Sequence, residues 1–318
     1  MPLSLTYAGG LYDRTMALRT GEIVPEGVRL EYLTLPVEDV FWRMMRYQEY
    51  DLSEMSLASY AIAHERGEPD FMAIPVFPSR HFRLSNIYVR ADSPLSALSE
   101  LRGKRIGMPE YQMTAAVWLR GILAEHHGIP TESVEWRTGR PERLAIALPP
   151  NVSVSSYAGP GGLEGALLAG EIDALMAARM PEGFARSGTL RRLLPDSREA
   201  EVAYYRATGL FPIMHTVVLK GALYRDHPWV ARSISEAFER AKQQAFDAMY
   251  DSTALRYSLP WLTEEIEATR AVLGDDFWPY GLAANRENVD TLLRYLFEQG
   301  LTRTLLRADT LFAPNVID

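Results

Sequence analysis

Cysteine is absent from the 318 residues of this chain, which excludes disulfide bonds, thiolate metal sites and cysteine nucleophiles. Long apolar runs are also absent, because no stretch approaches the roughly 20 residues that span a bilayer. Basic side chains are outnumbered, with 33 Lys and Arg against 41 Asp and Glu and a net charge of −8. We therefore expect neither nucleic acid nor a membrane as partner. A few arginines inside a cleft could still hold a small acidic ligand.

Several signatures of other enzyme classes are missing. The chain has no phosphate-binding G-x-x-x-x-G-K-[ST] loop, no G-x-S-x-G nucleophile turn and no His-x-x-x-His pair. We expect no cofactor and no metal, although scattered histidines and acids could assemble a metal site in space. No cationic stretch or apolar run of export length precedes the strand predicted at residues 3–8. This start predicts a cytoplasmic protein.

The residues that are present alternate between strand-like and helix-like runs, which is typical of α/β folds with mainly parallel sheets flanked by helices. In residues 37–47, Val40, Phe41, Met44 and Met45 form an apolar stripe at helical spacing. Further strands are predicted at 28–35, 50–55, 71–77, 85–90, 134–137, 152–157 and 172–177, and further helices at 12–20, 57–65, 163–169 and 228–250. Another helix is predicted to be capped by Thr114 and to end at His127, before Gly128.

The order of these elements predicts two lobes. Residues 1–89 and 211–318 form the first, discontinuous lobe, and residues 90–210 form the second. Residues 209–219 are interpreted as the return crossing, and the C-terminal helix near 289–297 is expected to pack on the first lobe. At 318 residues the chain is long enough for a sizeable core in each lobe.

Five segments carry a family resemblance. The loop and strand at residues 101–109 (LRGKRIGMP) resemble the entry to the second lobe of type II periplasmic binding proteins. Residues 51–57 (DLSEMSL), 77–83 (FPSRHFR), 209–216 (GLFPIMHT) and 277–281 (FWPYG) resemble 4,5-dihydroxyphthalate decarboxylases, cytoplasmic relatives of those proteins. The resemblance implies a two-lobed binding-protein fold with the ligand cleft between the lobes. It also implies loss of one carboxylate from a dihydroxylated aromatic diacid.

That reaction defines the groups to look for. Protonating the ring carbon that bears the carboxylate avoids an aryl anion, and a hydroxyl para to it supplies electrons as it loses its proton. Carbon dioxide then leaves and the ring becomes aromatic again. The route needs a proton donor, a proton acceptor and cations that hold the remaining carboxylate, and it needs no electron-sink cofactor.

Arginine suits the remaining carboxylate because its planar fork bonds both oxygens. Arg80 is the first candidate, and Arg83 lies three residues further on, just after a predicted strand where ligand crevices form. Arg14 is a third candidate, at the start of a helix after Gly9 and Gly10. Each of the three could instead be a solvated or ion-paired surface residue.

Proton transfer points to His215, Glu54 and His81. His215 lies in an apolar run at the crossing, and a histidine titrates near working pH; a hydrogen-bonded core histidine is the alternative. Glu54, in a largely apolar stretch, could be a carboxyl held protonated by desolvation, or half of a structural salt bridge. His81, between two arginines, could serve the same purpose or lie outside the site.

Substrate hydroxyls and the ring need polar and aromatic neighbours. Ser53 and Ser56 belong to the end of a predicted strand and the start of a helix, although Ser56 is also a plausible helix cap. Phe82 could wall the ring, as could Trp278 and Tyr280, or these side chains could be core. Three residues open a second-lobe helix whose N–H groups suit an anion, namely Tyr111, Gln112 and Thr114.

Two functions remain open at this stage. The first is a decarboxylase of the 4,5-dihydroxyphthalate type acting on a small aromatic carboxylate. The alternative is a solute-binding protein that captures a small carboxylate without chemistry, since one fold hosts many functions. A homo-oligomer is left open.

Overall fold

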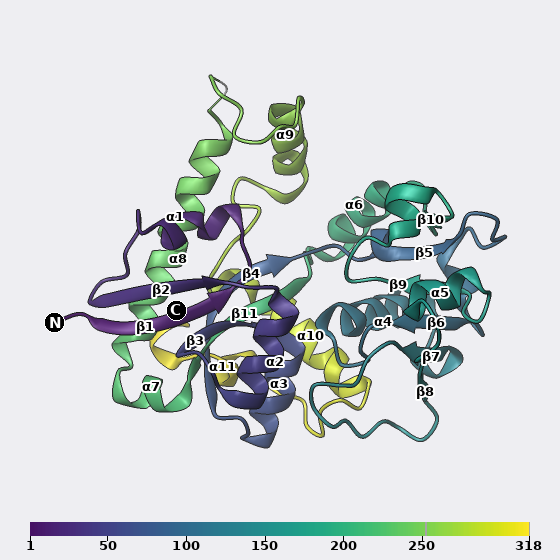
Figure 1. Cartoon of the computed structure of the whole chain (residues 1–318), viewed down its shortest axis with the longest axis horizontal. Helices are drawn as coiled ribbons and strands as arrows, with labels where there is room; N and C mark the ends of the chain where they lie inside the picture. The colour runs from purple at the N-terminus through teal and green to yellow at the C-terminus, as the bar shows by residue number, and fades with distance from the viewer. Residues whose placement is uncertain (252, 318) are drawn as a thin grey trace. The chain divides into compact units, whose positions relative to one another are not determined.

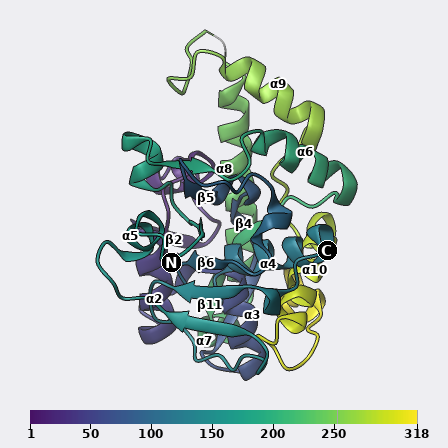
Figure 2. The ribbon, with the colours of Figure 1, turned by 90° about the vertical axis from the view of Figure 1, so that its right-hand side faces the viewer.

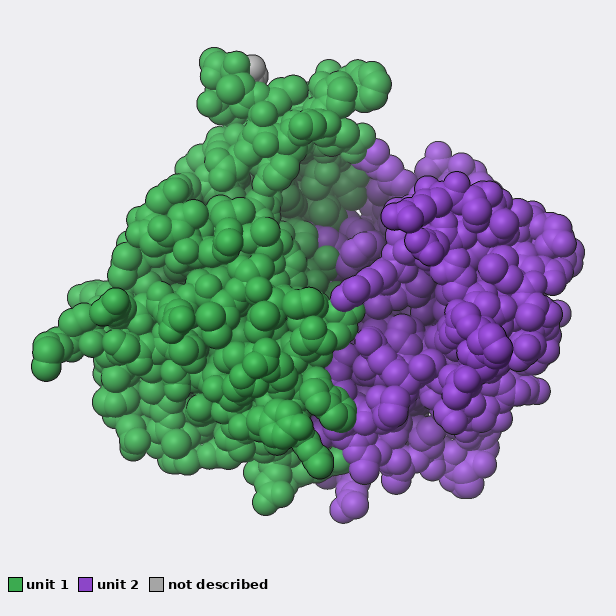
Figure 3. All heavy atoms as spheres, viewed as in Figure 1, with its two compact units in different colours: residues 1–80, 213–290, 307–318 green, residues 81–212, 291–306 purple. Residues whose placement is uncertain are grey.

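The computed structural model describes residues 1–251 and 253–317. It divides the chain into two compact units, coloured separately in Figure 3. Unit 1 comprises Met1–Arg80, Ile213–Asp290 and Arg307–Asp318, and unit 2 comprises His81–Pro212 and Thr291–Leu306.

Unit 1 is built on a five-stranded sheet of order β2-β1-β3-β11-β4. Its strands are β1 (Leu3–Gly9), β2 (Val28–Thr34), β3 (Leu52–Ser56), β4 (Phe71–Arg80) and β11 (Ile213–Lys220). β1 pairs in parallel with β2 and β3, whereas β11 is antiparallel to both β3 and β4. The late strand β11 is thus inserted between two early strands, so residues far apart in the sequence become neighbours.

The helices of unit 1 bury apolar faces against this sheet (Figure 1). Helix α1 (Met16–Thr20) and the long α8 (Trp229–Met249) pack on a core of strand residues. Helix α2 (Val37–Tyr47) contacts β3 and β1, and α3 (Leu57–Arg66) contacts β11 and β3. In Figures 1 and 2, α9 (Leu262–Leu273) lies beside α8 at one end of the unit. Short helices α7 (Gly221–Asp226) and α11 (Ala308–Leu311) complete the unit.

Unit 2 holds a six-stranded sheet of order β10-β5-β9-β6-β7-β8. β6 is parallel to β7 and β9, and β7 to β8, whereas β5 is antiparallel to β9 and β10. The strands are β5 (Ile87–Arg90), β6 (Arg105–Met108), β7 (Glu135–Thr138), β8 (Ser153–Ser156), β9 (Ala174–Met176) and β10 (Leu190–Arg192), and the helices are α4 (Thr114–His127), α5 (Gly162–Leu168) and α6 (Ser197–Thr208). Both units therefore have the predicted α/β character, but their sheets are mixed: parallel pairs outnumber antiparallel ones in unit 2, and the two kinds are equal in unit 1.

The unit boundaries differ from the predicted lobes in three places, the smallest being residues 211–212, which belong to unit 2. Residues 81–89 belong to unit 2, because β5 pairs with β9 and β10 there. Thr291–Leu306, which includes the end of α10 (Arg286–Glu298), also belongs to unit 2 rather than to the first lobe. The reason is the ring of Tyr295, which fills the space over Gly121 so closely that a Cβ there would lie 2.2 Å from it. Such tertiary packing has no signature in local sequence patterns.

Local start and stop signals agree with the observed helices. The hydroxyl of Ser56 accepts a hydrogen bond from the backbone N–H of Ser59 and caps α3, which ends at Gly67 in the left-handed conformation. Helix α4 runs over the predicted residues, but Met113 is its N-cap and Thr114 is its first helical residue. α2 spans the predicted residues 37–47, with the predicted apolar stripe buried.

Candidate active site

Glu54 is the centre of the polar cluster at the end of β3. Its side chain is fully buried. Three donors reach the carboxylate: the backbone N–H of Gly10 at 2.9 Å, the hydroxyl of Tyr12 at 2.7 Å and Nδ1 of His215 at 2.6 Å. Gly10 and Tyr12 follow β1 and His215 lies on β11, the two strands that flank β3. The strand order therefore assembles the cluster.

The protonation state of Glu54 follows from these contacts. Burial alone would raise the pKa of the carboxyl, but the hydrogen bond and charge of His215 and the bonds from Gly10 and Tyr12 lower it below its ordinary value. The carboxylate is ionised at neutral pH. Of the two readings of Glu54 left open by the sequence, the ion pair fits this geometry and the neutral carboxyl does not, because three donors outweigh desolvation.

His215 is oriented by this carboxylate. An ionised carboxylate only accepts hydrogen bonds, so Nδ1 of His215 carries a proton, and Nε2 is the ring nitrogen that Glu54 does not engage. The ring lies edge-on to Phe41, with centroids 4.8 Å apart. Its side chain is 16% exposed, in a strand that is otherwise mostly buried. Register shifts on either side of His215 in the pairing with β4 set it apart from the regular ladder.

Arg14 is connected to this pair through Tyr12 and is held between two aromatic rings. Its guanidinium carbon is 4.3 Å from the centroid of Tyr12 and 4.1 Å from that of Trp278. Nε donates to the carbonyl of Pro78 at 2.8 Å, and Nη1 lies 2.9 Å from the carboxylate of Asp13. The cation is thus fixed in position by stacking as well as hydrogen bonds.

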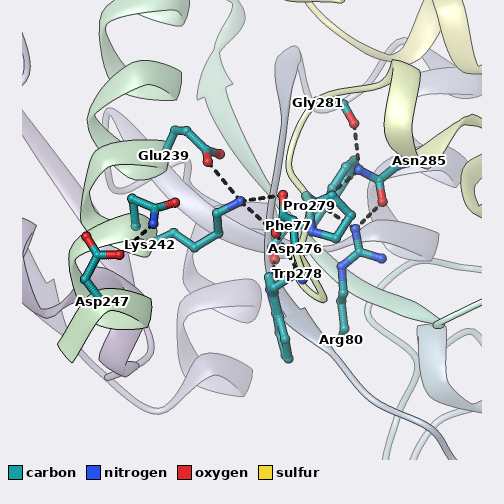
Figure 4. Close-up of polar contacts among 11 residues, drawn as sticks. Phe77, Arg80, Glu239, Lys242, Asp247, Asp276, Trp278, Pro279, Gly281 and Asn285 are labelled. Carbon is teal, nitrogen blue, oxygen red and sulfur yellow. Dashed lines mark hydrogen bonds and ion pairs between the residues drawn. The ribbon is translucent and has the colours of Figure 1, made fainter. Parts of the chain in front are cut away.

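Arg80, the first arginine candidate, is engaged within unit 1. It lies at the end of β4 and is 5% exposed. Its Nη2 donates to the carbonyl of Pro279 at 2.7 Å and to the side-chain oxygen of Asn285 (Figure 4). The structure therefore places Arg80 where it anchors a segment of its own chain.

Of the remaining candidates in unit 1, Ser56 caps α3 and Ser53 is fully buried on β3. The Ser53 hydroxyl has no hydrogen-bond partner among residues 1–251 and 253–317. The sequence left open whether Ser56 caps a helix or binds substrate, and in the structure its hydroxyl caps α3.

Residues 81–83 belong to unit 2. Burial lowers the pKa of Arg83 to about 10, an effect opposed by the nearby charge of Glu201, so Arg83 stays cationic at neutral pH. Phe82 stacks on Phe211 with centroids 4.6 Å apart, and His81 is exposed. The structure thus places His81 in a different unit from Glu54 and His215.

The segment before α4 holds an anion, and the anion is a side chain of the protein. The backbone N–H groups of Tyr111 and Gln112 donate to the carboxylate of Glu142 at 2.6 and 3.0 Å. Tyr111, Gln112 and Thr114 are all buried in unit 2. The predicted preference of these N–H groups for a carboxylate is therefore satisfied within the unit.

Sequence reasoning missed Gly10 and Tyr12, which bind Glu54 in unit 1, and Glu142, which binds the N–H groups of Tyr111 and Gln112 in unit 2. The position of Gly10 and Tyr12 directly after β1, beside the strand that carries Glu54, is the signal that could have indicated these two residues.

In the described part of the chain, no group of three or more His, Asp or Glu side chains is arranged to hold a metal ion. No helix in the same part is long and apolar enough to cross a membrane.

The strand order of unit 1 and the second α/β unit define the class as proteins with the periplasmic solute-binding fold. The structure resembles the aliphatic sulphonate-binding protein SsuA from Escherichia coli, with a TM-score of 0.58, 12% identity and coverage of 100% of this chain and 99% of that one. It also resembles the desulfurization enzyme DszB, with a TM-score of 0.56, 15% identity and coverage of 98% and 96%. At these identities the likeness concerns the fold. Residues 22–148 match the family of phosphonate ABC transporter periplasmic substrate-binding proteins.

Sequence similarity is more specific. The chain is 36% identical over 323 aligned residues to a 4,5-dihydroxyphthalate decarboxylase from Comamonas testosteroni, covering 99% of this chain and 98% of that protein. It is 38% identical over 212 residues to a 4,5-dihydroxyphthalate decarboxylase from Pseudomonas putida, covering 64% and 82%. The chain belongs to the 4,5-dihydroxyphthalate decarboxylase family.

Proposed function

We propose that this protein is a carboxy-lyase that removes one carboxylate from a dihydroxylated aromatic diacid of the 4,5-dihydroxyphthalate type. Family membership over nearly the whole chain supports the reaction class. The observation that carries the chemistry is the contact of the buried carboxylate of Glu54 with His215, with 2.6 Å between Oε1 and Nδ1. A histidine oriented by a carboxylate is a common general acid and base.

The proposed reaction exchanges one proton for one carbon dioxide. A proton is added to the ring carbon that bears the departing carboxylate, while the para hydroxyl loses its proton and becomes a ketone oxygen. The bond between this carbon and the carboxylate then breaks, and its electron pair restores the aromatic ring and the phenolate. The phenolate takes up a proton, giving 3,4-dihydroxybenzoate.

In this scheme His215 delivers the proton to carbon through Nε2. Glu54 stays ionised, accepts from Nδ1 and stabilises the imidazolium before it gives up its proton. Burial and the charge of Glu54 raise the pKa of Tyr12 far above its ordinary value, so Tyr12 remains a donor to Glu54. Tyr12 therefore orients the carboxylate and does not act as a base.

The remaining carboxylate of the substrate needs a fixed cation. Arg14 is the candidate that the geometry favours, because it stacks on the same Tyr12 that binds Glu54. All three of its nitrogens already donate, Nε and Nη2 to the carbonyl of Pro78 and Nη1 to Asp13, so substrate would use the second N–H of each terminal nitrogen. Arg83, half-buried and cationic, is the candidate in unit 2.

The test is to incubate the purified protein with 4,5-dihydroxyphthalate and to follow carbon dioxide and 3,4-dihydroxybenzoate together. Release of both in equal amounts supports the proposal. Tight binding without release would instead favour a solute-binding protein. A cytoplasmic location is part of the proposal, and fractionation of cells that express the native gene tests it.

A further inference from the structure

Lys242 is a buried charge that the proposed reaction does not use. It lies on the buried face of α8 and is 1% exposed. Figure 4 shows its side chain reaching between Glu239 and Asp276. The ammonium is 2.9 Å from the carboxylate of Glu239, one turn away on the same helix, and 3.2 Å from both oxygens of Asp276. A lysine is rarely buried so completely unless it is paired.

The two carboxylates differ in what they are attached to. Glu239 is part of α8, whereas Asp276 belongs to residues 275–281, which we call the tryptophan loop. Asp276 also accepts from the backbone N–H of Trp278 at 3.3 Å, and Lys242 lies 5.0 Å from the ring centroid of Tyr280 in the same loop. Lys242 therefore ties this loop to α8.

The tryptophan loop reaches the site through Trp278. The indole N–H donates to the carbonyl of Phe77 at 2.9 Å, and the ring stacks on Arg14. Arg14 stacks in turn on Tyr12, which donates to Glu54. The contacts are continuous from Lys242 through Asp276, Trp278, Arg14 and Tyr12 to Glu54, all within unit 1.

A second anchor holds the far end of the loop. Arg80 and Asn285 both donate to the carbonyl of Pro279, and the backbone N–H of Gly281 donates to the carbonyl of Pro75 at 2.8 Å. The loop is therefore fixed to β4 at one end and to α8 at the other. At the α8 end the Lys242–Asp276 ion pair is accompanied by Phe277, which stacks on Phe246 of α8 with ring centroids 4.5 Å apart.

We propose that the Lys242–Asp276 ion pair is a positioning device that sets Trp278 against Arg14 and thereby fixes the carboxylate-binding cation of the site. This inference rests on the proposed function. Its distinctive consequence is an asymmetry between two carboxylates that contact one ammonium. Losing Asp276 should loosen the loop around Trp278, although Phe277 still stacks on Phe246, whereas losing Glu239 should not.

The kinetic test compares Asp276→Asn with the matched control Glu239→Gln. Asp276→Asn should raise KM for 4,5-dihydroxyphthalate on the order of tenfold with a smaller change in kcat, because the misplaced group binds substrate. Glu239→Gln should leave both constants within about twofold of the wild type. Asp276→Asn should add nothing further in a Trp278→Leu background. Equal effects of the two single substitutions, or full additivity with Trp278→Leu, would overturn the proposal.

A second measurement needs no substrate and separates this inference from the proposed function. Amide hydrogen exchange should quicken in residues 275–281 and 10–15 of Asp276→Asn and stay unchanged in Glu239→Gln. Unchanged exchange in Asp276→Asn would overturn the positioning role even if the wild type is an active decarboxylase. If exchange quickens in Asp276→Asn but the wild type shows no decarboxylase activity, the positioning role of the ion pair stands and the proposed reaction does not.

Discussion

Glu54 and His215 are 161 positions apart in the sequence, yet Oε1 of Glu54 lies 2.6 Å from Nδ1 of His215. They lie on the neighbouring strands β3 and β11, which run antiparallel. The pair is buried on the carboxylate side and partly exposed on the imidazole side, at 0% and 16% of the side chain. A buried anion next to an accessible imidazole is the arrangement that proton transfer to a bound substrate requires.

The lowered pKa of Glu54 predicts a stability effect with a definite sign. A carboxyl whose pKa is lower in the folded state contributes stability above its unfolded pKa, near 4.3, and that contribution is lost as the pH falls through the folded value. Glu54→Gln should therefore lower the unfolding free energy at pH 7 by about 1–3 kcal/mol. The difference from the wild type should shrink below about pH 4. Urea unfolding across pH measures it.

The exposed Glu264 on α9 supplies the control for that series. Glu264→Gln should leave stability nearly unchanged at every pH. If the difference in unfolding free energy between wild type and Glu54→Gln grew as the pH was lowered, Glu54 would be protonated in the folded protein at neutral pH.

Tyr12→Phe should reduce turnover on the order of tenfold, because the ring that stacks on Arg14 is kept and only the 2.7 Å hydrogen bond to Glu54 is lost. Steady-state assays of carbon dioxide release measure the change. Tyr224→Phe is the matched control, since it removes a hydrogen bond of 3.0 Å to Asn315 at another place in unit 1. Normal turnover in Tyr12→Phe would mean that the position of the carboxylate does not depend on this hydroxyl.

Arg14→Lys should weaken binding of phthalate-type diacids on the order of ten- to a hundredfold while leaving the affinity for catechol unchanged. Lysine keeps the charge but loses the planar fork and the stack between Tyr12 and Trp278. Calorimetric titration with both ligands separates a carboxylate contact from a general loss of the site. A parallel loss of catechol affinity would show that Arg14 only shapes its surroundings.

Arg80→Ala should destabilise the folded protein by about 1–3 kcal/mol, because the oxygens of Pro279 and Asn285 lose a buried donor. Chemical unfolding without ligand measures this. Arg286→Ala, which removes an exposed ion pair with Asp309, should cost less than about 1 kcal/mol. Unchanged stability in Arg80→Ala would return Arg80 to the substrate-binding candidates.

Sequence patterns predicted the elements of this fold better than the partners of its side chains. The apolar stripe of residues 37–47 is a local property, and α2 has those bounds. The contact of Tyr295 with Gly121, which brings residues 291–306 into unit 2, joins distant segments and leaves no periodic pattern. For the same reason Glu54 and His215 could each be chosen as reactive groups, whereas their pairing required the strand order.

The candidate anion-binding groups show the same limit, because their partners within the protein could not be read from the sequence. Arg80 looks available in the sequence because it follows an apolar strand, but its partner Asn285 lies 205 positions away. The N–H groups of Tyr111 and Gln112 were expected to bind an anion, and that anion is supplied by Glu142. A residue type and its place after a strand predict what a side chain can bind and not which group binds it.

The central claim is that His215 moves the proton that replaces the carboxylate. The most direct measurement compares wild type and His215→Asn for both binding and turnover of 4,5-dihydroxyphthalate, with His64→Asn on α3 as the histidine control. Asparagine can still donate to Glu54, so binding should be retained while turnover falls roughly a hundredfold or more. Near-normal turnover in His215→Asn, with substrate bound, would contradict the account.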